Sequence, residues 1–246
     1  MTLHLIELPL DLRDLNNWAG GRKQGQGFDE GQTLHHLLGE VFGPAALQPF
    51  RLMVAPRART GTLYAYAALD ADGLRRQAMA SLTPVQSEVV ALDRLRSLPR
   101  PAETWQSGQR IGFDLRLRPV VRLASPLAGH DDGAVVSFRK GAEVDAFLAQ
   151  VLRGVETTRE QAYLDWLAER LSPSVNLDRS TTRLARFQRN RIQRGGKTIE
   201  GPDAIVHGTL TVTDPGRFAD LLAKGVGRHR SYGYGMLLLR PPQRGR

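Results

Sequence analysis

The most informative segment of the sequence lies near the end of the chain: Gly225-Val226-Gly227-Arg228-His229-Arg230-Ser231-Tyr232-Gly233-Tyr234-Gly235. Two Gly-x-Gly pairs enclose five residues, after a short helix pattern and before a final strand pattern at 236–239. Glycine allows positive φ and lets backbone N–H groups approach a phosphate. The arginines add charge, and the tyrosine rings can stack on bases. No Gly-Lys-Ser/Thr follows, so this is not a nucleotide P-loop. A plain glycine-rich turn is the alternative.

The charge of the whole chain points to a polyanionic partner. The sequence has 34 Lys and Arg against 25 Asp and Glu, a formal net charge of +9. Basic side chains that replace condensed counterions on a polyanion gain entropy, so nucleic acid is the first partner to consider and an anionic membrane surface the second. There is no cysteine, which excludes disulfides and cysteine-ligated zinc. We expect no membrane span and no signal peptide, and therefore a cytoplasmic location.

The first half of the chain has the element order of a ferredoxin-like domain. A strand pattern at 2–10 is followed by a helix that starts after Asp29, with Gln32 at capping-box spacing, and ends at Gly43. Strand patterns at 50–57 and 61–69, a short helix near 74–82 and a long alternating strand at 110–123 complete the order strand, helix, strand, strand, helix, strand. We predict an N-terminal domain over residues 1–120.

We expect the second half to repeat this order. Helix patterns at about 143–153 and 157–171 precede a basic stretch, a strand at 204–213 and a short helix after Asp214. We therefore predict an α+β protein of two tandem ferredoxin-like (RRM-like) domains, the second over residues 121–246, with a helical insertion in the C-terminal half. The two halves share no evident sequence repeat, so the duplication rests on element order alone. The pattern leaves open whether 179–194 is a hairpin or a helix.

Basic residues gather in two runs of the second half. Seven lie between Arg179 and Lys197 with no acid among them, and no acid follows Asp220 to the end of the chain. A single basic run is usually a solvated face, but two in one domain favour a surface for an RNA stem, which is recognised by shape and phosphate. The predicted RNA-contacting residues are Arg22 and Lys23 of the loop before the first long helix, Arg183, Arg186, Arg189, Arg191, Arg194 and Lys197 of the first run, and Gly225, Gly227, Arg228, His229, Arg230, Tyr232, Gly233 and Gly235 of the glycine-rich loop.

Four segments resemble the CasE family, the repeat-cleaving subunit of type I-E Cascade complexes. They are Leu34-His35-His36-Leu37-Leu38, Phe113-Asp114-Leu115-Arg116-Leu117-Arg118-Pro119-Val120, Ala162-Tyr163-Leu164-Asp165-Trp166-Leu167-Ala168-Glu169-Arg170-Leu171 and Val206-His207-Gly208-Thr209-Leu210-Thr211-Val212 with the glycine-rich loop behind it. The resemblance lies in their order from the first helix to the C-terminus. Related proteins process RNA in type IV systems, so the CRISPR subtype stays open.

The resemblance implies a metal-independent endoribonuclease. Such a protein would bind the stem-loop of CRISPR repeat RNA and cut the precursor by attack of a 2′-hydroxyl, leaving a 2′,3′-cyclic phosphate. It would then retain the mature crRNA and join the other subunits of a Cascade-like effector complex. We expect no cofactor, and no metal, because no carboxylates stand at ligand spacing from the histidines. A non-catalytic crRNA-binding subunit of the same fold and a ferredoxin-like RNA-binding protein unrelated to CRISPR are the alternatives.

His35 matches the catalytic histidine of the family, with His36 as the fallback. Its imidazole can serve as a base or an acid near neutral pH, and Gly31 and Gly39, one turn away on either side, suggest an open surface around the ring. An ordinary half-buried helix residue is the alternative. Family members often carry a tyrosine three residues before this histidine. Gln32 stands there instead, which cannot transfer a proton and for which we expect a capping or phosphate-orienting role. Arg22 and Lys23 are then candidates for charge stabilisation.

Overall fold

The computed structural model describes residues 2–21, 29–131, 133–194 and 197–242. Its first half forms an antiparallel sheet in the order β2-β3-β1-β4. The strands are β1 (Leu3–Asp11), β2 (Phe50–Met53), β3 (Thr60–Ala67) and β4 (Arg96–Arg100). The helices are α1 (Leu12–Gly20), α2 (Glu30–Phe42), α3 (Ala71–Met79) and α4 (Pro84–Val89). This strand order is that of a ferredoxin-like domain, and the helices pack their apolar residues against the sheet in one core.

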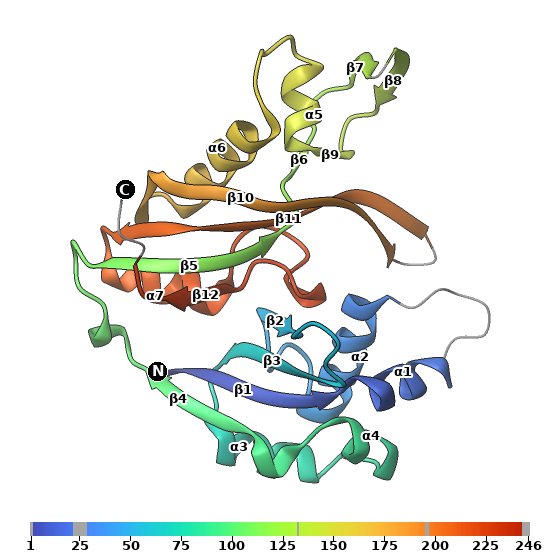
Figure 1. Cartoon of the computed structure of the whole chain (residues 1–246), viewed down its shortest axis with the longest axis vertical. Coiled ribbons are helices and arrows are strands. Elements are labelled where there is room, and N and C mark those ends of the chain that lie inside the picture. The colour runs from blue at the N-terminus through green and yellow to red at the C-terminus, as the bar shows by residue number, and fades with distance from the viewer. Residues whose placement is uncertain (1, 22–28, 132, 195–196, 243–246) are drawn as a thin grey trace.

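The second half forms another antiparallel sheet with the equivalent order, β10-β11-β5-β12 (Figure 1). Its strands are β5 (Arg110–Leu117), β10 (Val175–Arg194), β11 (Lys197–Val212) and β12 (Leu237–Arg240). The helices α6 (Arg159–Leu171) and α7 (Pro215–Lys224) contribute to its separate core. The prediction of two ferredoxin-like domains is therefore confirmed.

The predicted division at residue 120 is too late in the chain. β5 pairs with β11 and β12, so it is the first strand of the second sheet and not the last of the first. The strand that closes the first sheet is β4, which runs along β1 and is mostly exposed. β4 lies at the sheet edge and contains Pro99, so it lacks the alternation that reveals a half-buried strand. The sheets therefore divide between Arg100 and Arg110.

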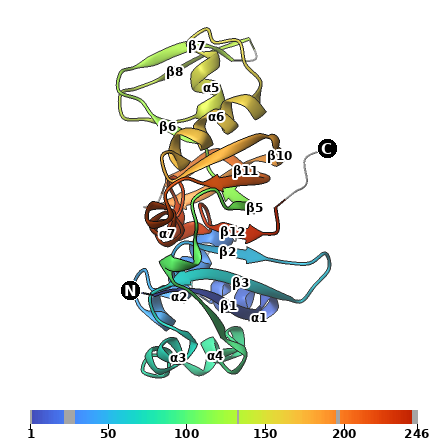
Figure 2. The ribbon, with the colours of Figure 1, turned by 90° about the vertical axis from the view of Figure 1, so that its left-hand side faces the viewer.

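The predicted insertion contains more strand than helix. It holds α5 (Ala146–Val151), the antiparallel pair β6 (Val120–Arg122) and β9 (Glu143–Asp145), and the hairpin of β7 (Leu127–Asp131) and β8 (Ala134–Phe138). Figure 2 shows these elements at the top, the second sheet in the middle and the first domain below. The insertion thus extends the second domain on the side away from the first.

The basic stretch is a hairpin. β10 and β11 pair to their ends, and the distal half extends past β5 toward α2, which β10 contacts (Figure 1). On the helix side, the Phe187 ring packs on the guanidinium of Arg159, 4.1 Å from ring centroid to Cζ. Arg159 also donates to Asp145 and to the Tyr163 hydroxyl, both at 2.8 Å. This cluster fixes the middle of the hairpin to α6.

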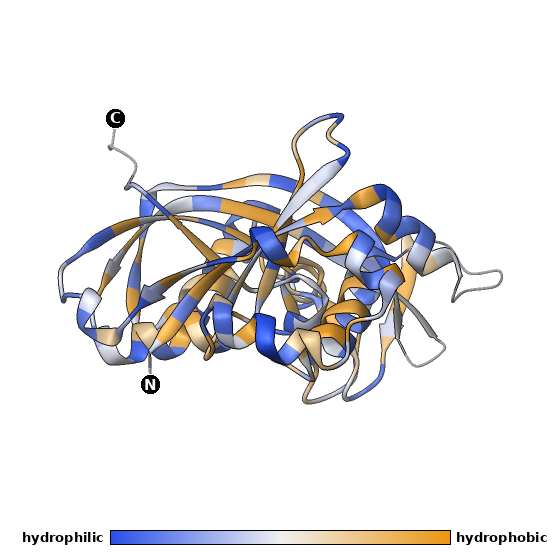
Figure 3. Cartoon of the chain, turned by 90° about the horizontal axis from the view of Figure 1, so that it is seen from below, coloured by the Kyte–Doolittle hydropathy of each residue, from blue (hydrophilic) through white to orange (hydrophobic). Residues whose placement is uncertain are grey.

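Apolar and polar residues alternate along the strands (Figure 3). No helix within the described ranges is long and apolar enough to cross a membrane. The two domains meet through side chains as well: the Tyr66 hydroxyl on β3 donates to the Leu237 carbonyl on β12 at 3.1 Å, and the Ser231 hydroxyl donates to Gln48 at 3.2 Å. The first domain is therefore placed directly against the segment that holds the glycine-rich loop.

Candidate active site and RNA interface

His35 lies where the first domain meets the glycine-rich loop. α2 begins as predicted, since the Asp29 carboxylate accepts from the Gln32 N–H at 3.0 Å. The His35 ring is half-buried, with its centroid 5.3 Å from that of Tyr232 and 5.3 Å from that of His36. Its Nδ1 is buried with no hydrogen-bond partner among the described residues. Burial, and then the charge of His36, lower the pKa of His35, so the ring is a neutral imidazole at neutral pH.

The two glycines beside His35 have different surroundings. A Cβ on Gly39 would meet nothing within 4 Å, as an open surface requires. A Cβ on Gly31 would lie 2.7 Å from the Tyr232 carbonyl oxygen. The expectation of an open surface was therefore wrong for Gly31, whose missing side chain lets the loop backbone pack on α2.

The other predicted catalytic residues occupy different positions. His36 is exposed, and its ring is the near neighbour of His35. Asp29 is the N-cap of α2 and accepts the backbone N–H of Gln32, which is half-buried. The capping or phosphate-orienting role expected of the Gln32 side chain stays a prediction. Arg22 and Lys23 lie outside the described residues. His35 and Tyr232, from opposite ends of the sequence, are the pair that the fold brings together.

The four glycines of the loop allow its backbone to adopt a compact conformation. Their φ angles are between +72° and +81°, a region that other residues adopt only with strain. Gly225 and Gly235 donate their N–H groups to the carbonyls of Leu221 and Arg116, each at 2.7 Å. The predicted positive φ is confirmed, but these two N–H groups are bonded to the chain itself. The glycines let the backbone fold closely on itself.

We expect Gly235→Ala to destabilise the protein by about 1–3 kcal/mol, because alanine would have to adopt positive φ there and its Cβ would clash with the Val226 carbonyl oxygen. Denaturant unfolding measures this. Gly216→Ala on α7 is the control, since its Cβ would make only an ordinary 3.5 Å contact with Asp214. Equal stability of both variants would contradict this account of the loop.

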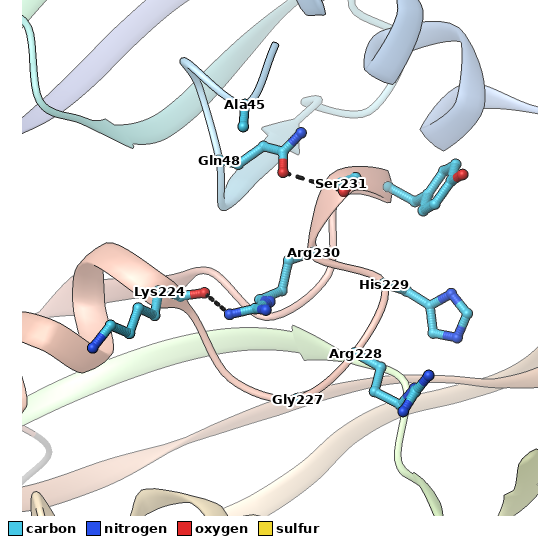
Figure 4. Close-up of a pocket in the computed structure, with 9 residues that line it drawn as sticks. Ala45, Gln48, Lys224, Gly227, Arg228, His229, Arg230 and Ser231 are labelled. Atoms are coloured by element: carbon cyan, nitrogen blue, oxygen red, sulfur yellow. Dashed lines mark hydrogen bonds between the residues drawn. The ribbon is translucent and has the colours of Figure 1, made fainter. Parts of the chain in front are cut away.

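The loop borders a pocket of about 560 Å³ with basic side chains on its rim (Figure 4). Arg230 is exposed and points toward Lys224, where it donates to the backbone carbonyl, whereas Arg228 and His229 point to the other side of the loop. Arg228 is 46% exposed and pairs with Glu143 at 2.7 Å. Lys224, Arg228 and Arg230 are thus placed to contact an anionic ligand.

Two loop residues do not present a surface to a ligand. His229 is buried, with Nε2 3.0 Å from Glu143 Oε2, so it holds the loop to β9. Tyr234 is buried under the guanidinium of Arg116, 4.7 Å from ring centroid to Cζ. The expectations that His229 contacts RNA and that the Tyr234 ring stacks on a base therefore do not fit this arrangement. Tyr232 is half-buried and keeps the place beside His35.

The hairpin displays its basic residues on both faces. Arg183, Arg186, Arg189 and Arg191 are exposed. Successive strand residues point to opposite faces, and Arg186 lines a pocket on the face toward the first domain. On β10, Arg189 and Arg191 point to the same face as Phe187, which is the face opposite to Arg186. Arg194 and Lys197 pair at the hairpin end, and their side chains lie outside the described part.

Acids from neighbouring segments offset part of this charge. Glu200 on β11 lies across from Arg191. Its Oε2 is 3.2 Å from Arg191 Nε, and its Oε1 is 4.0 Å from Arg189 Nη1. Asp165 on α6 pairs with Arg179 at 2.8 Å. The basic run is therefore less unopposed in the fold than in the sequence. Within the described part of the chain, no three His, Asp or Glu residues are grouped so that they could hold a metal ion.

Two groups of buried ion pairs could not be predicted from the sequence. Asp114 on β5 is paired with Arg51 at 3.3 Å, with Arg240 at 2.8 Å and with His207 at 2.8 Å. Beside it, Arg116 donates twice to Asp203, at 2.8 and 2.7 Å. These groups line the sheet face toward the first domain. Their signal in the sequence is the charged residues that alternate with apolar ones along 110–118, since such a face must be covered or bind a ligand.

The comparisons with known proteins agree with this fold. The sequence matches the family described as CRISPR associated protein over residues 3–241. It has no significant match among curated proteins. The structure is similar to that of CRISPR endoribonuclease Cse3 bound to a 19-nucleotide RNA, at 20% identity and TM-score 0.64, covering 98% of this chain and 100% of that one.

Two further structures have the same fold. One is Thermus thermophilus Cse3 bound to an RNA that represents a pre-cleavage complex, at 18% identity and TM-score 0.64, covering 98% of this chain and 100% of that one. The other is the CRISPR-associated protein Cas6e from Escherichia coli K-12, at 17% identity and TM-score 0.53, covering 97% of this chain and 99% of that one. The similarity extends over the whole length of these proteins, so both domains and the insertion belong to the shared fold.

Proposed function

The chain belongs to the CRISPR-associated protein family, and we propose that it is a metal-independent endoribonuclease that processes CRISPR repeat RNA in the cytoplasm. The observation that carries the proposal is the placement of the neutral His35 against Tyr232, beside a basic hairpin and loop. The structural relatives support it, since two are named as Cse3 bound to RNA and others as parts of a CRISPR RNA-guided surveillance complex. The proposed partners are repeat RNA, the mature crRNA and further subunits of such a complex.

In this proposal the stem of the repeat lies along the hairpin and the scissile phosphate reaches His35. The neutral imidazole accepts the proton of the 2′-hydroxyl, whose oxygen attacks the adjacent phosphorus as the bond to the leaving 5′-oxygen breaks. The leaving 5′-oxygen takes up a proton from water, so the products are a 2′,3′-cyclic phosphate and a 5′-hydroxyl. Tyr232, whose ring centroid lies 5.3 Å from that of His35, donates a hydrogen bond to the phosphate or the leaving oxygen. His36 is the fallback for either proton transfer.

Incubation with the repeat RNA of the same genome in EDTA tests the proposal, with an RNA whose stem cannot pair as the control. Cleavage at one site of the paired RNA alone supports the nuclease. If the protein neither binds nor cleaves the paired RNA, the proposal is overturned.

One observation favours a second function, a non-catalytic crRNA-binding subunit. Gln32 stands where related proteins often have a tyrosine, and it cannot transfer a proton. Tight binding of the repeat RNA without cleavage in the same experiment would establish this function instead.

We expect Glu200→Gln to strengthen binding of the repeat stem a few-fold, because it removes the negative charge that lies 3.2 Å from Arg191 and 4.0 Å from Arg189. The salt dependence of binding should become steeper, whereas removal of either arginine should lower its slope by about one. Titration of labelled RNA at several salt concentrations measures both. Asp72→Asn is the control, since Asp72 pairs with Arg75 on α3, away from the hairpin. An unchanged slope in both arginine variants would remove this face of the hairpin from the interface.

A further inference from the structure

A second pocket opens between the two domains, on the side of the hairpin that faces α2. Its volume is about 410 Å³. It is lined from the first domain by the start of α2 and the end of β2, and from the second by β5, β10 and β11. Three arginines are among the lining residues: Arg51, Arg116 and Arg186. The mechanism above uses none of them.

The acids of this pocket are already engaged. Asp203 accepts two hydrogen bonds from Arg116 and one from Gln188, the last at 3.0 Å. Glu30 lies 3.7 Å from Arg116, and burial raises its pKa. The charge of Arg116 is therefore compensated inside the pocket, and the carboxylates of Asp203 and Glu30 are not available to bind a cation.

The other two arginines leave positive charge in the pocket. Arg186 is exposed and donates to the Gln188 amide oxygen at 2.8 Å. Arg51 is only 6% exposed and lies 3.3 Å from Asp114, a carboxylate that Arg240 and His207 also share. Its Nη1 has no hydrogen-bond partner among the described residues. A buried guanidinium with so little compensation is costly unless an anion joins it.

The remaining lining is apolar and partly open. Leu52, Met53 and Ile205 are half-buried, and Val54 is 45% exposed. Guanidinium groups beside an apolar floor match a nucleotide, which has a negatively charged phosphate and a flat base. A free anion would leave the apolar floor unused, and an apolar ligand would leave the arginines unpaired.

The position of the pocket relates it to the cleavage chemistry. Glu30 is on the pocket wall and His35 is five residues further along the same helix, which is roughly 7–8 Å along the axis. A strand whose phosphate lies at His35 therefore has its neighbouring nucleotide within reach of the pocket.

We propose that this pocket binds an unpaired nucleotide that flanks the scissile phosphate, with its base on Leu52, Val54 and Ile205 and its phosphate at Arg51 and Arg186. The inference rests on the proposed function and names a further part of the substrate. Unpaired RNA is recognised through bases that are splayed out of the stack. Capture of one such base turns the strand out of the stem at the cleavage point, so that the 2′-hydroxyl and the phosphorus can align.

The test compares four RNAs and three proteins. The RNAs are the stem-loop alone, the stem-loop with its flanking nucleotides, and two versions that lack the base on one side of the scissile phosphate. A 2′-deoxy substitution at the cleavage point keeps the longer RNAs intact during the measurement. The proteins are the wild type, Val54→Trp to fill the pocket from its exposed edge, and Met79→Trp, which adds the same ring at a 77% exposed position on α3.

For wild type and Met79→Trp, loss of one of the two bases should weaken binding about 5- to 20-fold, in the range of single-base contacts. Val54→Trp should bind the stem-loop alone as tightly as the wild type but should no longer distinguish the base-lacking RNA. Two outcomes would overturn this inference and leave the proposed function intact. In the first, the stem-loop binds and removal of either base leaves its affinity unchanged. In the second, removal of a base weakens binding to Val54→Trp as much as to the wild type. Failure to bind the stem-loop at all would overturn both.

Discussion

His35→Ala is expected to slow cleavage of the repeat RNA by about 10²- to 10⁴-fold, the usual contribution of a general acid or base. Binding should change little, because the half-buried ring adds no charge at neutral pH. Single-turnover cleavage with protein in excess separates the two effects. His4→Ala, which removes a histidine of β1 on the first domain, is the control. Cleavage at the wild-type rate in His35→Ala would assign the chemistry to another group, with His36 the first to examine.

The pH dependence gives a second signature of the same residue. Burial and the charge of His36 lower the pKa of His35. A base must be unprotonated, so the rate should fall only when the pH drops through this lowered pKa, which lies below the ordinary value of a histidine. His36→Gln removes the neighbouring charge and should move this acidic limb to higher pH. A limb that stays in place would show that His35 is not the titrating base.

Gly31→Ala is expected to reduce cleavage about 10- to 100-fold, the effect of a displacement of about 1 Å at a catalytic group. Its Cβ would lie 2.7 Å from the Tyr232 carbonyl oxygen, so α2 and the loop must move apart. Gly39→Ala is a matched control, because it lies one turn from His35 on the other side and its Cβ would meet nothing within 4 Å.

The two glycine variants should differ in stability as well as in activity. Alanine is favoured over glycine within a helix by about 1 kcal/mol, so Gly39→Ala should be slightly more stable than the wild type and cleave as well. Denaturant unfolding and single-turnover cleavage measure both properties. Equal activity of the two variants would contradict the claim that Tyr232 must lie against His35.

The ferredoxin-like order of both halves could be predicted from the sequence, but the boundary between the two sheets and the strands of the insertion could not. Helices such as α2 have a cap, an apolar stripe and a terminal glycine, which are local signals. β4 is a short, exposed edge strand, and its identity depends on its pairing with β1. The alternation of β5 indicates a strand, yet it does not say which sheet the strand joins. Pairing between distant segments is a property of the whole chain.

The candidate site was predictable in its residue types and less so in its contacts. The histidine on α2 and the glycine-rich loop could be found separately, but only the fold places Tyr232 against His35. His229 and Tyr234 have side chains suited to RNA, and burial removes them from the surface. Glu143 and Glu200 compensate arginines that have no acid near them in the sequence. Residue type indicates chemistry, whereas exposure and partners depend on tertiary packing.

The most direct test of the central claim is cleavage, in EDTA, of the repeat RNA with a single 2′-deoxy substitution at the nucleotide before the scissile phosphate. Attack by the 2′-hydroxyl requires that oxygen, so we predict tight binding with no cleavage of the substituted RNA. The unsubstituted RNA should be cut at that position to a 2′,3′-cyclic phosphate and a 5′-hydroxyl. Cleavage of the substituted RNA at the same bond, or a loss of cleavage of the normal RNA in EDTA, would contradict the proposed chemistry.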